Sequence, residues 1–171
     1  YDTDGTTELK YVVKETSGKS GYTVVYGDDE SATYVQDNGS VTNKEEDTEV
    51  TVAKKWLNAD GSTTAPAGAT VVLSLYKGTT VEAAAASTDA IATITLDGTA
   101  DDEGEYVSWK ARFTGLSKYD TDGTTELKYV VKETSEKSGY TVVYGDDESA
   151  TYVQDNGSVT NKEEDTEVTV A

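Results

Sequence analysis

The chain has 171 residues, and its 33 acidic and 14 basic side chains give a net charge of −19 at pH 7. It contains no cysteine and no histidine. Disulfides, thiol nucleophiles, zinc–thiolate sites, imidazole metal ligands and Ser-His-Asp triads are therefore excluded, and we expect no metal and no cofactor. The acidic charge argues against nucleic acid and anionic lipid surfaces as partners. No apolar run approaches the ~20 residues of a membrane span.

The remaining composition favours a folded protein made of strands. The chain has 12 tyrosines, and valine and threonine are also frequent, which are residues that suit β-structure. The chain begins at Tyr1 without a charged-then-apolar leader. We therefore expect an acidic, all-β surface protein, and an internal piece of a longer polypeptide.

An internal repeat dominates the organisation. Residues 1–53 return as residues 119–171 at an offset of 118, and the only change is Gly18 to Glu136. Such near-identity indicates recent duplication and predicts a tandem repeat array.

Short strands follow one another along one period of the repeat. Apolar alternation and turn residues predict strands at 49–61, 69–78, 91–98, 105–113, 125–134 and 139–145. Residues 150–157 and 158–163 are one or two more, separated by an Asn-Gly turn signal. Residues 81–87 are a helical turn or a loop. Strands of this length and spacing are typical of a β-sandwich.

The acidic sequence KEEDTE, at 44–49 and again at 162–167, is the best linker between repeats. It predicts one complete repeat at 49–162. Residues 1–48 are then the later strands of a preceding repeat, and residues 163–171 the first strand of a following one.

Three of these strands carry a polar residue in phase with an apolar face, namely Lys54, Glu133 and Asn161. Strand side chains alternate between two faces. Lys54 therefore shares a face with Trp56, Glu133 shares one with Val131, and Asn161 is in phase with the valine two residues before it. Buried polar groups are costly unless they meet, so we expect the three to lie together.

Their meeting would make a specific reaction available. Burial lowers the pKa of a lysine and raises that of a glutamic acid. A neutral Lys54 amine can attack the Asn161 carboxamide while protonated Glu133 polarises it and relays a proton to departing ammonia. Alternation alone, however, favours a simpler arrangement, a buried Lys54–Glu133 ion pair with Asn161 hydrogen-bonded to backbone.

The sequence resembles the Cna B-type domain, which builds stalks of Gram-positive surface adhesins and pili. The resemblance rests on four blocks in order: VTVAKKW, WKARFTGLSKYDTDGTTELKYVVKET, GYTVVYG and SVTN. The family has a lysine two residues before a tryptophan, which falls on Lys54. It also has a Tyr-x-Val-x-Glu strand, which ends at Glu133, and a terminal Thr-Asn, which ends at Asn161.

The resemblance implies an immunoglobulin-like β-sandwich with a self-formed isopeptide bond from Lys54 to Asn161, promoted by Glu133. Glu15 and Asn43 are the equivalent residues of the first copy, and they lack a lysine partner in this chain. The family further implies a bacterial cell-surface protein, anchored to the cell wall through regions outside this chain, whose partners are adjacent repeats.

The resulting prediction is a structural stalk or spacer repeat rather than an enzyme, since the cross-link would form only once. The alternative is an adhesin module that binds a host protein or glycan through the 77–105 segment, which matches no family block, or through its tyrosines. Near-identical repeats favour the spacer, because binding surfaces diversify. Other domains could still carry a host ligand site.

Overall fold

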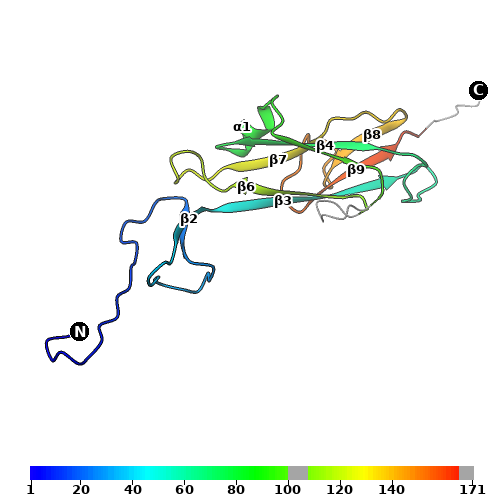
Figure 1. Ribbon diagram of the computed structural model, residues 1–171. Helices are drawn as coiled ribbons and strands as arrows, with labels where there is room; N and C mark the ends of the chain where they lie inside the picture. Colours follow the sequence, from blue (N-terminus) through cyan, green and yellow to red (C-terminus); the bar gives the residue numbers. More distant parts are fainter. Residues whose placement is uncertain (100–107, 166–171) are drawn as a thin grey trace, which may run out of the picture. The chain divides into compact units, whose positions relative to one another are not determined.

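The computed structural model describes residues 1–99 and 108–165, and the chain divides into two compact units (Figure 1). Unit 1 comprises Tyr1–Asp47 and Ser117–Glu126, and unit 2 comprises Thr48–Leu116 and Leu127–Ala171. We describe each unit separately.

Unit 2 is built from two β-sheets, as the all-β sandwich prediction requires. The first sheet has the order β6-β3-β9-β8 and consists of Lys110–Ser117, Asp47–Leu57, Gly157–Glu163 and Tyr140–Tyr144. The second has the order β5-β4-β7 and consists of Ala92–Leu96, Val71–Gly78 and Lys128–Glu133. β3 and β9 pair in parallel, whereas β4 pairs antiparallel with both of its neighbours.

The hydrophobic core of unit 2 draws residues from both sheets. The pattern on β3 is strict, because Val50, Val52, Lys54 and Trp56 are buried while Lys55 is exposed. The facing sheet and β9 add fully buried side chains, among them Leu73, Leu75, Val131 and Val159. The predicted inward direction of Lys54 is therefore confirmed.

The short helix α1, Val81–Ala86, covers part of unit 2. The Thr80 side chain caps it by accepting a hydrogen bond from the Ala83 N–H. Ala84 packs with Tyr76 and Val130 in a second apolar cluster, so β7 is buried on both faces. The helical option for residues 81–87 is confirmed.

Turn geometry corrects two predicted strand boundaries. β3 ends at Leu57 rather than 61, because the Gly61 N–H donates to the Asn58 carbonyl. β6 begins at Lys110, because Ser108 and Trp109 have φ angles of 23° and 64°, which a strand cannot contain. The predicted residues 105–107 lie outside the described part.

Of the one or two strands predicted over 150–157 and 158–163, the structure has one, β9, and the segment 150–156 forms no strand. Within it only Val153 pairs, in a single bridge to Val131. Asn156 has a φ of 61° and the Gly157 N–H donates to the Gln154 carbonyl, so a tight turn occupies this segment and β9 starts at Gly157.

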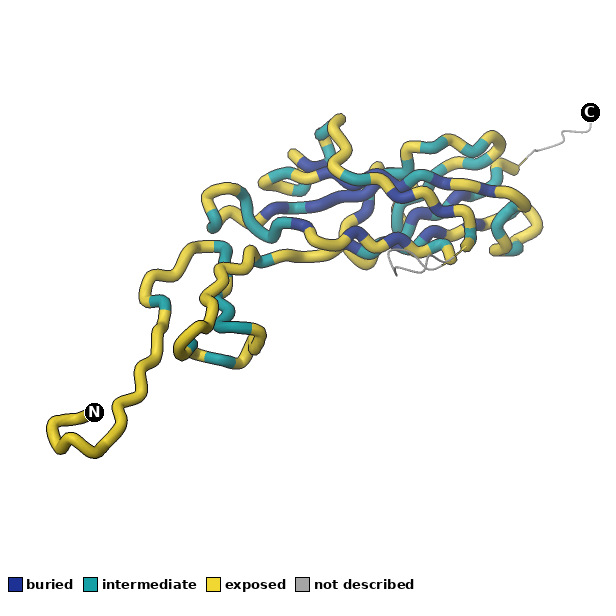
Figure 2. Tube along the Cα trace, viewed as in Figure 1, coloured by how far each residue is buried: buried dark blue, intermediate teal, exposed yellow. Residues whose placement is uncertain are grey.

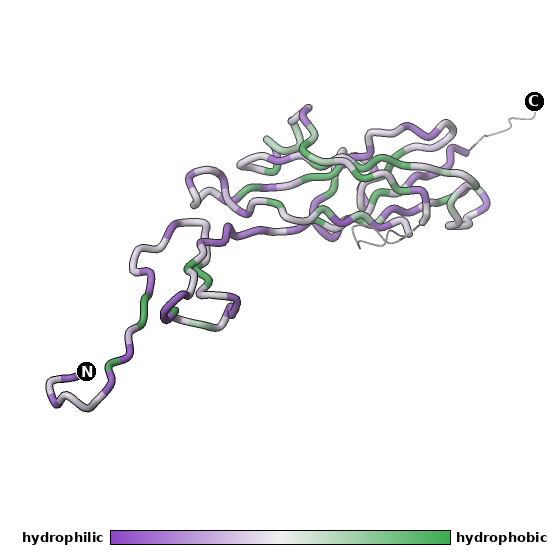
Figure 3. The backbone as a smooth tube through the Cα atoms, in the orientation of Figure 1, coloured by the Kyte–Doolittle hydropathy of each residue, from purple (hydrophilic) through white to green (hydrophobic). Residues whose placement is uncertain are grey.

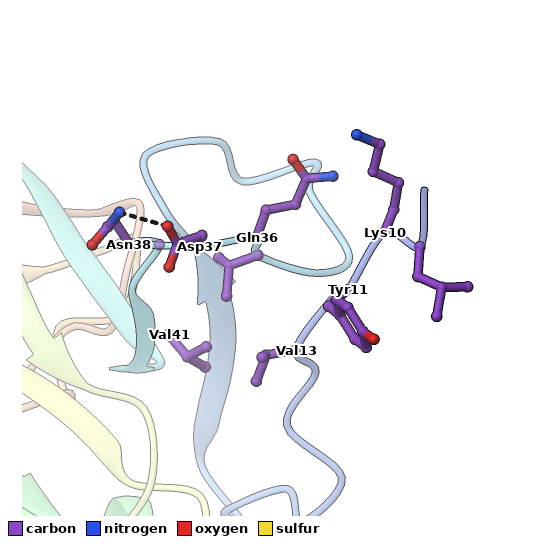
Figure 4. Close-up of a pocket in the computed structure, with 10 residues that line it drawn as sticks. Lys10, Tyr11, Val13, Gln36, Asp37, Asn38 and Val41 are labelled. Atoms are coloured by element: carbon purple, nitrogen blue, oxygen red, sulfur yellow. Dashed lines mark hydrogen bonds between the residues drawn. The ribbon is translucent and has the colours of Figure 1, made fainter. Parts of the chain in front are cut away.

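Unit 1 contains one antiparallel hairpin, β1 (Tyr22–Tyr26) and β2 (Val41–Glu45). The structure describes all of unit 1, and none of its residues is buried (Figure 2). Hydrophobic stretches occur in both units (Figure 3), but only unit 2 buries them. In unit 1, Leu9, Tyr11, Val13, Val35 and Val41 line an open groove (Figure 4).

Candidate functional site

The parallel pairing of β3 with β9 brings Lys54 and Asn161 onto one buried face. Lys54 lies opposite Val159, and Trp56 lies opposite Asn161. Since side chains alternate, Lys54 and Asn161 are diagonal neighbours on the core side of this sheet. Glu133 is the last residue of β7 in the other sheet. The three residues predicted from the sequence therefore come from three strands and both sheets.

The side chains of these residues contact one another. Lys54 Nζ lies 3.7 Å from Glu133 Oε2, and both side chains are completely shielded from solvent. Asn161, which is 0% exposed, donates a hydrogen bond of 3.0 Å from Nδ2 to Glu133 Oε1. Glu133 therefore stands between the amine and the carboxamide and touches both.

Burial controls the protonation of the pair. It lowers the pKa of Lys54 to about 8, because desolvation of the ammonium outweighs the attraction of the facing Glu133 carboxylate. It also raises the pKa of Glu133, against the opposing effects of Lys54 and the Asn161 hydrogen bond. Both shifts favour the uncharged forms, a free amine and a carboxylic acid.

Two polar atoms of the site have no hydrogen-bond partner although they are buried. These atoms are Glu133 Oε2 and Asn161 Oδ1. An unsatisfied buried acceptor costs about 1–3 kcal/mol. If the Asn161 amide were rotated, a protonated Glu133 could donate a hydrogen bond to Asn161 Oδ1, and this hydrogen bond would polarise the carboxamide.

The amine is held in place by the backbone and by an aromatic ring. Lys54 Nζ donates to the carbonyls of Lys55 at 2.8 Å and Val159 at 3.3 Å. It also lies 4.5 Å from the centroid of the Trp56 ring. The site thus places an amine, a carboxyl and a carboxamide in contact and out of reach of solvent.

Sequence reasoning missed one residue that touches this site. The Tyr144 hydroxyl on β8 accepts a hydrogen bond of 3.0 Å from the Glu133 backbone N–H. Tyr140, Val142 and Tyr144 alternate on one face of β8, which was the available signal.

The first copy retains part of the arrangement. Asn43 Nδ2 donates to Glu15 Oε2 at 3.2 Å, and the Tyr26 hydroxyl accepts the Glu15 N–H at 3.0 Å. Glu15 and Asn43 therefore meet, as their counterparts do, but Asn43 is exposed whereas Asn161 is fully buried.

Other sequence features have structural explanations. In the sequence DTDG, the Asp122 carboxylate accepts hydrogen bonds from Thr124 and Thr125 and closes a turn. Within residues 1–99 and 108–165, no group of acidic side chains has the arrangement of a metal site. Over the same ranges, no helix has the length and apolar character needed to cross a bilayer.

Comparison with protein families gives a match to the Cna protein B-type domain over residues 50–162, which is more than half of the chain. The chain belongs to this family. The match contains Lys54, Glu133 and Asn161, and it starts and ends inside the predicted repeat at 49–162. A comparison with curated proteins found no match.

Three solved structures are similar to this Cna B-type chain. The single B repeat unit of the collagen-binding surface protein of Staphylococcus aureus has a TM-score of 0.44 and 24% identity, with 84% of this chain and 60% of that chain covered. A two-repeat structure of the same protein has a TM-score of 0.42 and 22% identity, and the match covers 87% of this chain and 31% of that chain. The minor pilin GBS52 of Streptococcus agalactiae has a TM-score of 0.42 and 17% identity, and the match covers 81% of this chain and 61% of that chain.

The chain therefore spans less than two thirds of the length of each of these structures. They are a B repeat unit, a pair of such units and a pilin.

Proposed function

We propose that the chain is a stalk or spacer segment of a bacterial cell-surface adhesin or pilus-like protein. Its complete repeat is 49–162, flanked by the later strands of one repeat at 1–48 and the first strand of another at 163–171. This repeat is stabilised by a self-formed isopeptide bond between Lys54 and Asn161. One observation carries the proposal: an amine, a carboxyl and a carboxamide are buried in contact, with two polar atoms left unsatisfied.

The reaction transfers the acyl group of Asn161 from ammonia to lysine. The neutral Lys54 amine attacks Asn161 Cγ, while protonated Glu133 donates a hydrogen bond to the amide oxygen. The tetrahedral adduct gives up the proton of the attacking nitrogen through Glu133 to the departing nitrogen. The Cγ–Nδ2 bond breaks, ammonia leaves, and Glu133 ends in its starting protonation state.

The product would remove the least favourable feature of the fold. A buried amine and a buried acid are each costly in a dry core. An amide in place of the amine carries no charge, and a protonated Glu133 can satisfy its oxygen. The exposed Lys55 next to Lys54 has no such environment, which explains why one of two adjacent lysines is the nucleophile.

The position of the bond suits a chain under tension. In unit 2, β3 starts at one end of the sandwich and β9 finishes at the other, since the two strands are parallel neighbours (Figure 1). A pull on both ends of the repeat therefore acts along these strands. A Lys54–Asn161 bond carries the load directly between them. The 107 residues between positions 54 and 161 could otherwise extend by roughly 350 Å.

Intact-mass measurement tests the bond. The wild-type chain is expected to be lighter than its sequence by one ammonia, and Lys54→Ala or Glu133→Ala should restore the full mass of the variant. Lys55→Ala and Asn43→Ala are matched controls that should still lose ammonia. A wild-type mass equal to that of the sequence would reject the bond.

Single-molecule pulling on the chain tests the stalk function. The wild-type repeat should resist extension beyond the bond, whereas Lys54→Ala should add an unfolding step of roughly 350 Å. If wild type and Lys54→Ala extended equally, the bond would have no mechanical role.

A further inference from the structure

The free edge of β7 is closed by a tyrosine from the opposite sheet. β7 is an edge strand of its sheet, and β8 is an edge strand of the other. Along this edge Val131 exchanges two backbone hydrogen bonds with Val153, of 2.8 and 3.0 Å. Glu133, two residues further on, donates its N–H to the Tyr144 hydroxyl at 3.0 Å. The phenol thus supplies the acceptor that a further strand would otherwise supply.

This hydrogen bond connects Glu133 to the strand pair that carries Asn161. β8 pairs with β9, with Tyr144 opposite Val159 and Val142 opposite Asn161. The backbone of Glu133 is therefore held by the same two strands that hold its carboxamide partner. Beyond Glu133, the Thr134 N–H donates to the Val72 carbonyl of β4, so the Tyr144 hydroxyl holds the side of the strand end that faces away from β4.

The first copy shows that the contact does not depend on the complete sandwich. The Tyr26 hydroxyl accepts the Glu15 N–H at the same distance of 3.0 Å, although unit 1 has no strand there. Asn43 still donates to Glu15. The tyrosine contact and the Glu–Asn contact therefore occur together in two different surroundings.

We propose that Tyr144 is a positioning residue for the Lys54–Asn161 cross-link: its hydroxyl fixes the end of β7 and so keeps the Glu133 carboxyl against Asn161. Tyr144 does not touch the reacting atoms and acts through Glu133. The inference rests on the proposed isopeptide bond and assigns a role to a residue outside the reacting set.

The rate of cross-linking tests the proposal. A chemically synthesised full chain is kept unfolded in acidic denaturant, refolded at neutral pH, and sampled over time for the fraction that has lost ammonia. Tyr144→Phe keeps the ring and removes only the hydroxyl. We expect it to slow the loss about fivefold to tenfold, as for one lost hydrogen bond that orders a catalytic group, while the final extent stays complete.

Two controls separate positioning from general stability. Tyr140→Phe removes another β8 hydroxyl, which donates to Asn58 Oδ1 at 2.8 Å and not to the site. Tyr26→Phe makes the Tyr144 change at the equivalent position of the first copy. In an Asn161→Ala background, Tyr144→Phe and Tyr140→Phe should lower the unfolding midpoint by similar amounts, but only Tyr144→Phe should slow cross-linking in the parent chain.

The outcomes distinguish the two proposals. A wild-type chain that never loses ammonia overturns the proposed function and this inference with it. Cross-linking of Tyr144→Phe at the wild-type rate, or equal slowing by Tyr140→Phe, overturns the positioning role alone. If Tyr144→Phe does not refold, hydrogen exchange in the wild type decides, because an unprotected Glu133 amide would also overturn that role.

Discussion

The same sequence occurs twice in this chain and has two structures. Residues 128–133 form β7, whereas the identical residues 10–15 form no strand. Tyr129 and Val131 are 8% and 0% exposed, but their counterparts Tyr11 and Val13 are 76% and 60% exposed. The hairpin behaves differently, since Tyr22–Tyr26 and Tyr140–Tyr144 are strands in both copies.

The difference follows from the origin of each strand's partner. The hairpin partner comes from the same copy, so β1 pairs with β2 as β8 pairs with β9. The partner of β7 is β4, which lies about 55 residues earlier in the chain and has no counterpart in unit 1. A residue pattern typical of a strand is therefore not sufficient without the strand that it pairs with.

The contacts of the candidate site also differ in whether they form within one copy of the repeat. Contacts of glutamate with asparagine and with tyrosine form in both copies, because all three residues lie within one copy. The lysine comes from β3, which precedes β4, and only unit 2 brings it to the glutamate. Bringing the lysine to the glutamate and asparagine thus requires strands that are distant in the sequence. The first copy, which has the glutamate and asparagine without the lysine, serves as a natural control.

The largest expected effect is the loss of the bond in Asn161→Ala, without diversion of Lys54 to Asn43. To reach Lys54, β2 of the first copy would have to replace β9 beside β3. In the same register, Lys44, the counterpart of Lys162, would then lie opposite Leu57. The chain would then return to Asp47 at the start of β3, about 33 Å away, with three residues that span about 11 Å. Parallel neighbours need a crossover of a dozen or more residues.

Mass spectrometry of Asn161→Ala should therefore show the full mass of the variant, and Asn43→Ala should show one ammonia lost. An Asn161→Ala chain that still loses ammonia, with a Lys54–Asn43 peptide after digestion, would contradict this reasoning. It would mean that the first copy can replace the second on β3.

The next effect is on stability. A cross-link over a loop of this length contributes about 4–5 kcal/mol in the chain-entropy model. Asn161→Ala should lower the free energy of unfolding of unit 2 by about that amount, and Asn43→Ala should leave it unchanged. Both tryptophans, Trp56 and Trp109, lie in unit 2, so denaturant unfolding followed by tryptophan fluorescence reports on this unit. Equal curves for the two variants would contradict the prediction.

A core substitution separates the copies by a smaller amount. Val131→Ala removes two buried methyl groups and should cost about 2 kcal/mol, whereas Val13→Ala removes exposed ones and should cost almost nothing. The same fluorescence measurement compares them, with both changes made in the Asn161→Ala background so that unfolding is reversible. An equal cost at both positions would mean that unit 1 also buries this valine in solution.

The sequence predicted the parts of the fold that alternation controls. The inward direction of Lys54 and the existence of each sheet strand of unit 2 follow from local periodicity and are confirmed. Of the two options for residues 81–87, a helical turn or a loop, the structure has the helical turn. The errors lie where backbone dihedrals decide, as at Trp109 and Asn156, whose positive φ angles interrupt strands that their neighbours favour. Alternation does not report these angles.

The site was predictable in its members but not in its geometry. Periodicity put Lys54, Glu133 and Asn161 on inward faces, but the parallel register that makes two of them neighbours depends on long-range pairing. Tyr144 was missed for a similar reason. Its hydroxyl accepts a hydrogen bond from the backbone of another strand, and a backbone N–H is the same whatever the residue type at position 133, so the sequence does not indicate the contact.

The smallest effect is that of pH on the rate of cross-linking, about tenfold per pH unit. It arises because the reactive pair of Lys54 and Glu133 holds one proton, whether its two groups are both neutral or both charged. The reactive form has a neutral amine and a carboxylic acid, and it holds as many protons as the ammonium–carboxylate pair, so their ratio does not change with pH. Above about pH 8, the pKa to which burial lowers Lys54, the pair loses this proton and cross-linking should slow. Below the raised pKa of Glu133 the pair gains a second proton, and cross-linking should slow again.

Glu133→Gln distinguishes this scheme from simple deprotonation of lysine. Glutamine has no acidic proton, and without the Glu133 carboxylate, which raises the pKa of Lys54, burial lowers that pKa further. The slower reaction of the variant should therefore accelerate with pH only below pH 8 and then stay constant, whereas the wild-type rate should fall above pH 8. Refolding of the synthetic chains at several pH values, followed by intact mass, measures both profiles. A wild-type rate that does not fall above pH 8 would mean that Glu133 acts only as a negative charge beside the lysine, since a proton donor must lose activity when its proton is gone.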